Sequence, residues 1–135
     1  IYKLRTMIHA SETAGAQWAE KKDPRITIVG RILRKTHIDE IPQMWNIVRG
    51  DIALVGPRPE RPEFVDTLEK AIPYYALRHS IKPGFTGWAQ VRYRYARTID
   101  DSKEKFEYDL YYLKNKNIFL DIGIIAKTIQ IIFTH

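Results

Sequence analysis

The sequence predicts one helix-rich domain of the α+β class, in which several amphipathic helices surround a small β-hairpin or short sheet. Three observations lead to this prediction. The chain has 135 residues, which is the size of one domain. Apolar residues recur at helical spacing in the longer segments, whereas runs of β-branched residues are short. The sequence contains no repeat or low-complexity tract, so we expect residues 1–135 to form a single domain.

The first half of the chain predicts one helix and one strand. A short β-branched run ends at Gly30, and apolar residues at spacings of three and four then predict a helix over residues 36–48, with Thr36 as its N-cap. Residues 52–55 are apolar and predict a short strand. The alternating prolines of residues 56–59 forbid a helix, so we expect a rigid, extended loop after this strand.

The second half of the chain predicts two helices, a turn and a further strand. Helical patterns cover residues 63–70 and 101–116, and the second begins with acidic side chains that favour a helix N-terminus. Residues 82–85 carry the Pro-Gly signal of a type II turn, and residues 87–93 follow as a predicted strand. Residues 118–133 are too apolar for a helix that faces only water. The sequence leaves three alternatives for this segment: it is buried in the core, it lies along a bilayer surface, or it packs against a hydrophobic partner.

The composition limits the classes of function. Cysteine is absent, which excludes disulfides, thiolate zinc sites and a cysteine nucleophile. The four histidines are scattered without ligand-like spacing, so no histidine metal site is predicted. Lys and Arg (22) exceed Asp and Glu (16), and the net charge of +6 favours an anionic partner such as nucleic acid, a phosphorylated metabolite or an acidic membrane face. No segment is long and apolar enough to span a membrane.

Two adjacent carboxylates, Asp39 and Glu40, lie at the start of the first predicted helix. The simplest interpretation is that they compensate the helix dipole. Neighbouring helical residues point about 100° apart, so the two groups can also divide a chemical task. One carboxylate can act as a nucleophile at phosphorus while the other binds a divalent cation.

Arginine and aromatic side chains supply two further candidates. Arg58 stands between Pro57 and Pro59, and a stiff backbone lowers the entropy that its guanidinium loses when it binds a phosphate. A structural turn with an exposed arginine is the alternative. Arginines and aromatic residues are interleaved over residues 88–97, as in proteins that stack nucleic-acid bases, although packing of the rings is the simpler explanation.

Six sequence blocks occur in order along the whole chain: YKLRTM (2–7), GRILRKTHIDEIPQ (30–43), WNIVRGD (45–51), LVGPRP (54–59), KPGFTGWAQV (82–91) and YDLYY (108–112). Together they resemble the bacterial sugar transferase family of monotopic phosphoglycosyl transferases. The resemblance implies an enzyme that moves a phosphosugar from a UDP-sugar to polyprenol (undecaprenyl) phosphate through a covalent aspartyl intermediate and releases UMP. This is a first step of exopolysaccharide or glycoconjugate synthesis at the cytoplasmic face of the bacterial inner membrane.

The resemblance also implies roles for individual residues. Asp39 matches the family's nucleophile, and Glu40 matches the neighbouring glutamate that helps to hold Mg²⁺. Arg34 and Arg58 match positions that contact substrate phosphate. Further positions match the polar lining of the family's active site and are expected to bind substrate: Lys3, Glu63, Arg94, Asp109 and Asp121.

The chain departs from the family's pattern in two places. After Val91 the family often has Asn-Gly-Arg, whereas this chain has Arg92-Tyr93-Arg94, followed by a longer acidic stretch over residues 98–104. The family's N-terminal hydrophobic helix, which enters and leaves the same leaflet, has no counterpart here. We therefore expect residues 1–135 to be the catalytic domain truncated before Ile1, and to be soluble or peripheral to the membrane.

Two alternatives to an active transferase remain. A basic nucleic-acid-binding module would explain the net charge, but it leaves the carboxylate pair and Arg58 without a role, and no basic recognition helix is evident. The chain could also be a catalytically silent membrane-surface or assembly fragment of the same family, because losing the membrane helix would hinder access to the lipid substrate. The transferase interpretation predicts no nucleic-acid partner.

Overall fold

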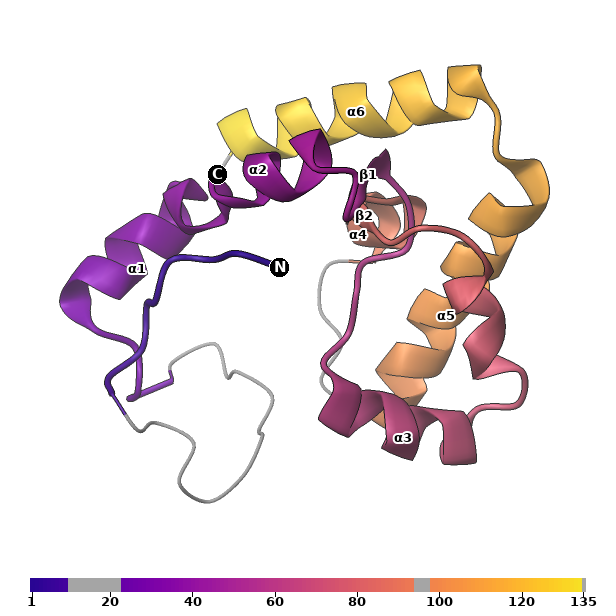
Figure 1. The fold of residues 1–135 in the computed structure, drawn as a ribbon, viewed down its shortest axis with the longest axis horizontal. Helices are drawn as coiled ribbons and strands as arrows, with labels where there is room; N and C mark the ends of the chain where they lie inside the picture. Colours follow the sequence, from indigo (N-terminus) through magenta and orange to yellow (C-terminus); the bar gives the residue numbers. More distant parts are fainter. Residues whose placement is uncertain (10–22, 94–97, 135) are drawn as a thin grey trace.

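The structure is a computed structural model that describes residues 1–9, 23–93 and 98–134, and it confirms a helix-rich α+β fold (Figure 1). In Figure 1, helix α6 runs along the top edge, and helices α3 and α5 pack together below it. The elements in chain order, with 3₁₀ helices labelled η, are α1 (Ile28–Lys35), η1 (Ile38–Glu40), α2 (Gln43–Val48), β1 (Ala53–Val55), α3 (Pro62–Ala71), η2 (Tyr75–Ser80), β2 (Gly84–Thr86), α4 (Trp88–Arg92), α5 (Ile99–Asn115) and α6 (Ile118–Phe133).

The sheet consists of strands β1 and β2, which run parallel. Ala53 pairs with Gly84, and Val55 pairs with Thr86. The short sheet and the strand predicted over residues 52–55 are thus confirmed, and the parallel direction makes the sheet a crossover pair rather than a hairpin.

The predicted turn at residues 82–85 and the predicted strand at 87–93 are wrong. Gly84 begins β2, where it lies against Gly56 so closely that a Cβ on Gly84 would stand 2.1 Å from the Gly56 nitrogen. This contact between backbones needs an extended chain at Gly84. The segment after Gly87 forms helix α4, because tertiary contacts outweigh the β propensity of such a short run.

The predicted helix over residues 36–48 is also wrong in its bounds. Thr27 caps an earlier helix, α1, by accepting a hydrogen bond from the Gly30 nitrogen at 2.9 Å. Thr36 therefore ends a helix instead of starting one. His37 follows with a left-handed φ of 56°, which breaks the helix and leads into η1 and then α2.

The helices predicted over residues 63–70 and 101–116 are confirmed as α3 and α5. Thr98 and Asp101 form a capping box at the start of α5, with reciprocal hydrogen bonds of 3.0 Å. The main core lies where α3 and α5 meet η2, and its fully buried members are Leu68, Ile72, Tyr75 and Phe106. These elements form the end of the molecule that supports the loop after β1.

Helix α6 is mostly exposed, so its burial in the core is excluded. Ile124 is the residue of α6 that is fully buried. The helix is held to the sheet by a 2.6 Å hydrogen bond between the Thr128 and Thr86 hydroxyls. Large apolar side chains face away from the protein along its length: Ile118, Phe119, Ile122, Ile129, Ile132 and Phe133. In the described part of the chain, no helix is long and apolar enough to cross a membrane.

Candidate active site

Asp39 is the buried carboxylate of the candidate site, with 2% of its surface exposed. It lies in η1, which begins directly after the left-handed residue His37. The N-terminal segment runs beside this turn, and the Leu4 nitrogen donates a 3.0 Å hydrogen bond to the Asp39 carbonyl oxygen. Gly30 lets the segment approach α1, because a Cβ there would lie 2.0 Å from the Thr6 carbonyl oxygen. The close packing brings Lys3 to the carboxylates.

Lys3, Asp39, Glu40 and Arg58 form one group of opposite charges, which we call the charged cluster. The Lys3 Nζ lies 3.0 Å from Asp39 Oδ2 and 3.1 Å from Glu40 Oε1. The Arg58 Nη2 lies 2.5 Å from the same Glu40 oxygen. These residues come from the N-terminal segment, η1 and the loop after β1, so folding unites groups that are distant in sequence.

The loop that carries Arg58 is anchored to the sheet. The Gly56 nitrogen donates to the Thr86 carbonyl oxygen, and the Gly84 nitrogen donates to that of Pro57, both at 2.9 Å. Arg58 stands between two prolines whose rings limit its backbone freedom. The sheet thereby holds the base of the loop while the guanidinium extends to Glu40.

The charged cluster keeps Glu40 ionised. Burial by itself would raise the pKa of Glu40, but the positive charges and hydrogen bonds of Arg58 and Lys3 outweigh burial and hold this pKa below its ordinary value of 4.5. The carboxylate is therefore negative at neutral pH, as a ligand for a metal cation must be.

The lowered pKa of Glu40 predicts loss of stability in acid. Its ionised form stabilises the fold above the ordinary pKa of 4.5, and this contribution disappears as the pH falls through the lower value of the folded state. We expect the free energy of unfolding, measured with urea at a series of pH values, to fall less steeply below about pH 4.5 in Glu40→Gln. Glu107→Gln, which changes an exposed carboxyl on α5, should follow the wild type. An unchanged acid slope in Glu40→Gln would contradict this assignment.

The carboxylate pair is suited to Mg²⁺. The Lys3 ammonium already contacts both carboxylates within 3.1 Å, which shows that one cation can lie between them. Mg²⁺ prefers oxygen ligands and is commonly held by one or two carboxylates together with waters and substrate phosphates. Among the described residues, no three His, Cys, Asp or Glu side chains are grouped so that they could hold a metal by themselves. Glu40, with Asp39 beside it, fits a Mg²⁺ site whose remaining ligands are waters or the oxygens of a bound phosphate.

The other predicted site residues that the structure describes lie outside the charged cluster. Arg34 donates from Nε to the Thr6 hydroxyl at 2.8 Å. Asp121 accepts a 2.8 Å hydrogen bond from the Tyr112 hydroxyl. Exposed Glu63 is 3.5 Å from Arg61 at the surface. Arg94 falls outside the described residues.

Asp109 is fully buried, with 1% of its surface exposed, and it pairs with Arg78 at 2.9 Å. Burial raises the pKa of Asp109 to about 6, against the opposing charges of Arg78 and Lys105. Arg78 is not among the site residues predicted from the sequence. A usable signal was present, because Asp109 follows Phe106 by three residues on the apolar side of the predicted helix, and a buried carboxylate needs a cationic partner.

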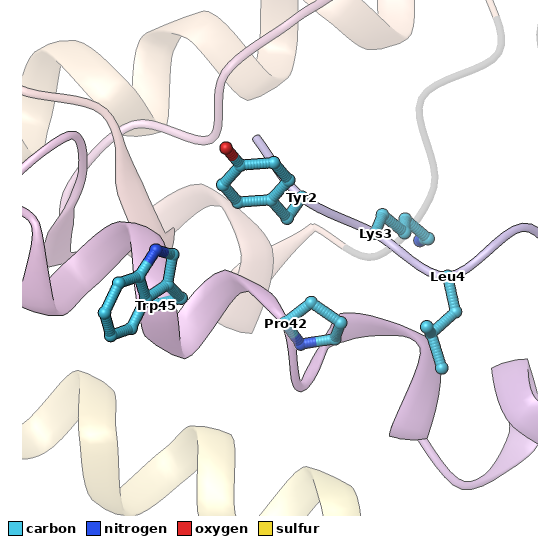
Figure 2. Close-up of a pocket in the computed structure, with 5 residues that line it drawn as sticks. All are labelled: Tyr2, Lys3, Leu4, Pro42 and Trp45. Carbon is cyan, nitrogen blue, oxygen red and sulfur yellow. The ribbon is translucent and has the colours of Figure 1, made fainter.

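An open pocket of about 400 Å³ adjoins the charged cluster. Figure 2 shows Tyr2, Lys3 and Leu4 of the N-terminal segment on one side, and Pro42 and Trp45 on the other. Four of these five residues are apolar or aromatic, and the fifth, Lys3, is shared with the charged cluster. The pocket therefore combines an apolar lining with a cationic group that reaches both carboxylates.

The arginine and aromatic residues near α4 pack against one another. Trp88 stacks on Tyr111 of α5, with 5.7 Å between ring centroids. The Arg92 guanidinium lies 4.3 Å from the centroid of the Trp88 ring. These contacts account for part of the interleaved pattern by packing.

Comparison with known sequences gives an independent result. The profile of the family described as "Bacterial sugar transferase" matches residues 1–135. A UDP-N-acetylgalactosamine-undecaprenyl-phosphate N-acetylgalactosaminephosphotransferase from Aeromonas hydrophila is 49% identical over 99% of this chain and 32% of its own length. A UDP-glucose:undecaprenyl-phosphate glucose-1-phosphate transferase from Xanthomonas campestris pv. campestris is 40% identical over 95% of this chain and 27% of its own. The chain thus spans about a third or less of these relatives.

Proposed function

Since the chain belongs to the bacterial sugar transferase family, we propose that it is the catalytic domain of a polyprenyl-phosphate sugar-1-phosphate transferase. Its reaction moves a phosphosugar from a UDP-sugar to undecaprenyl phosphate and releases UMP. The names of the relatives support these two substrates. The observation that carries the proposal is the buried Asp39 carboxylate, 3.0 Å from the Lys3 ammonium and adjacent to Glu40.

In the first step, an Asp39 oxygen attacks the phosphorus that bears the sugar. The bond from this phosphorus to the oxygen shared with the second phosphate breaks, and UMP leaves with the bonding electrons. Asp39 then carries the phosphosugar as an acyl phosphate. Burial in η1 limits the rotation of the Asp39 side chain, so less entropy is lost in reaching the attacking position.

In the second step, a phosphate oxygen of the lipid attacks the same phosphorus. The bond to Asp39 breaks, the carboxylate is regenerated, and the product is a polyprenyl diphosphate sugar. Lys3 has 42% of its side chain exposed, so its ammonium can move from the carboxylates to an arriving phosphate. Arg58 offsets negative charge on the phosphoryl oxygens.

Glu40 is the proposed Mg²⁺ ligand, with substrate oxygens and waters completing the shell. A Mg²⁺ ion held by Glu40 would supply positive charge to offset that of the diphosphate and of the leaving UMP. Within the chain, Lys3 and Arg58 hold Glu40 in the ionised form that this role needs.

Mass spectrometry of the full-length protein tests the proposal directly. After incubation with a UDP-sugar and Mg²⁺, the peptide that contains Asp39 should gain the mass of one phosphosugar while UMP appears in solution. UDP-N-acetylgalactosamine and UDP-glucose are the first donors to try, because the two relatives are named for them. Attachment of the phosphosugar to another residue would refute the mechanism.

The pocket beside Lys3 is the proposed position of the first isoprene units of the acceptor. Its apolar lining suits a hydrocarbon chain, and the ammonium at its edge suits the phosphate to which that chain is joined. The lipid phosphate would then arrive next to Asp39.

Trp45→Ala should raise the KM for undecaprenyl phosphate about tenfold, because it removes the largest apolar side chain of the pocket. Formation of the phosphosugar adduct from UDP-sugar alone should change little. Met44→Ala is the matched control, since Met44 is an exposed neighbour on α2 that does not line the pocket. An equal rise in both variants would argue against an acceptor chain at this position.

The exposed face of α6 is the proposed contact with the cytoplasmic leaflet of the inner membrane. Its apolar side chains can enter the boundary between headgroups and acyl chains, and the net charge of +6 attracts anionic lipids. This contact would bring the active site to the surface where the lipid acceptor lies.

Substituting both Phe119 and Phe133 with serine should weaken binding to anionic vesicles by at least about tenfold in co-sedimentation. The substitutions remove two exposed aromatic rings and with them their apolar contact with lipid. Wild-type binding should also fall as salt is raised. Tyr74→Ser, which removes another exposed aromatic ring outside α6, is the control. Binding that is indifferent to lipid charge and salt would contradict the electrostatic part.

A further inference from the structure

Arg78 is a buried arginine that contacts the main chain of the active-site loop. It lies in η2, and 3% of its surface is exposed. Its Nη2 donates a 2.7 Å hydrogen bond to the carbonyl oxygen of Arg58, which is 20 residues away in sequence. The guanidinium of Arg58 itself extends to Glu40 at 2.5 Å. Arg78 thus holds the backbone of a residue whose side chain belongs to the charged cluster.

Several neighbours fix the orientation of Arg78. Asp109 on α5 lies 2.9 Å from its Nη2, and the Tyr75 hydroxyl contacts its Nη1. The Tyr75 ring also lies under the guanidinium, 5.0 Å from Cζ to the centroid. Glu60 is 3.9 Å from Nη1 and 2.5 Å from the Lys105 ammonium. The loop, η2 and α5 are therefore joined through one guanidinium.

The chemistry of this contact requires arginine. A guanidinium has five N–H donors in a planar fork, so it can serve a carboxylate, a phenol oxygen and a carbonyl oxygen at once. A lysine ammonium at the same position cannot match this planar arrangement. Removing one partner of such a buried pair is costly, whereas the pair as a whole adds little stability compared with apolar packing. A role in positioning the loop explains its presence better than stability does.

We propose that Arg78, held by Asp109, is a positioning residue that fixes the Arg58 loop so that the Arg58 guanidinium reaches Glu40 and the substrate phosphate. Asp109, which matches the family's active-site lining, then acts through Arg78 and does not touch substrate, in keeping with its burial. The inference concerns catalysis and in that respect rests on the proposed function. Its structural part, the placement of Arg58, can be tested without activity.

The first test is a double-mutant cycle on UMP release by the full-length enzyme. Arg78→Lys should lower kcat about 10²-fold, the loss expected when a catalytic group is displaced by about 1 Å. In an Arg58→Ala background, Arg78→Lys should cause little further loss, because the group that it positions is gone. Leu68→Ala weakens the same core but removes no hydrogen bond or ion pair to Arg58, so the loss of kcat that it causes should be the same in the wild-type and Arg58→Ala backgrounds. If the fold-decrease in kcat of the double variant equalled the product of the decreases caused by Arg78→Lys and Arg58→Ala separately, the proposal would be overturned.

The second test measures the reactivity of Arg58 itself in the full-length enzyme. Arginines are labelled with p-hydroxyphenylglyoxal and located by peptide mapping. Labelling of Arg58 should speed up several-fold in Arg78→Lys and to a smaller extent in Asp109→Asn. In Leu68→Ala, Arg58 should be labelled at the wild-type rate. The exposed Arg49 serves as a reference and should be labelled at the same rate in all variants. Unchanged Arg58 labelling in both variants would refute the positioning role. A wild type without UMP release would refute the proposed function, and the labelling result would still decide the placement of Arg58.

Discussion

Replacing Asp39 with asparagine is expected to lower UMP release by at least about 10⁴-fold and to eliminate the phosphosugar adduct, because an amide cannot act as the nucleophile. The fold should persist. Asparagine has nearly the same shape as aspartate, and Lys3 keeps its 3.1 Å contact with Glu40. Discontinuous UMP assays and intact-protein mass spectrometry of the full-length enzyme measure the two effects.

The control for Asp39→Asn is Asp66→Asn, which neutralises an exposed carboxylate on α3. This variant should keep wild-type turnover and form the adduct. Urea unfolding of both variants separates loss of chemistry from loss of structure, and both should unfold near the wild-type midpoint. A phosphosugar adduct that still forms in Asp39→Asn would disprove the assignment of the nucleophile.

Gly84→Ala is expected to lower the free energy of unfolding by about 3 kcal/mol or more. A Cβ at this position would stand 2.1 Å from the Gly56 nitrogen and 2.6 Å from its Cα, and backbone atoms cannot move aside as a flexible side chain can. The strands must separate, and the loop that carries Arg58 moves with them. Urea unfolding followed by circular dichroism should show a much lower midpoint, and UMP release should fall as well.

Gly123→Ala is the matched control for Gly84→Ala. Gly123 lies within α6, and a Cβ there would meet nothing within 4 Å. Alanine at this position should stabilise the helix by about 0.5–1 kcal/mol, because glycine loses more backbone entropy on folding. If Gly84→Ala and Gly123→Ala unfolded at the same urea concentration, the close approach of the Gly56 and Gly84 backbones would not explain why position 84 is glycine.

The elements that could be predicted from sequence are those with strong local signals. Helix α5 has a periodic apolar face and a capping box at Thr98, and both depend on residues within a few positions of each other. The predictions failed where local signals compete. Thr27 and Thr36 are both plausible caps, and the first one starts the helix. The segment after Gly87 is short, so its β propensity is weak compared with the packing of α4 against α5 and α6, and the segment becomes helical.

The candidate site divides in the same way. Asp39 and Glu40 are adjacent, so their pairing is evident in the chain, and the resemblance to a family assigned their roles. Lys3 and Glu40 are 37 residues apart, and their contact depends on the path of the N-terminal segment along η1. The roles of Arg34, Glu63 and Asp121 stay predictions, as does that of Arg94.

The sequence by itself determined the family, the helix-rich class, the adjacent carboxylates and the proline-flanked arginine, because each is carried by residue types and short spacings. The tertiary structure decided which charges meet. Lys3 joins the carboxylates, Asp109 pairs with Arg78, and Arg78 holds the loop of Arg58. These contacts depend on the folded backbone, since a buried charge takes the partner that packing brings within about 3 Å, whatever their separation in sequence.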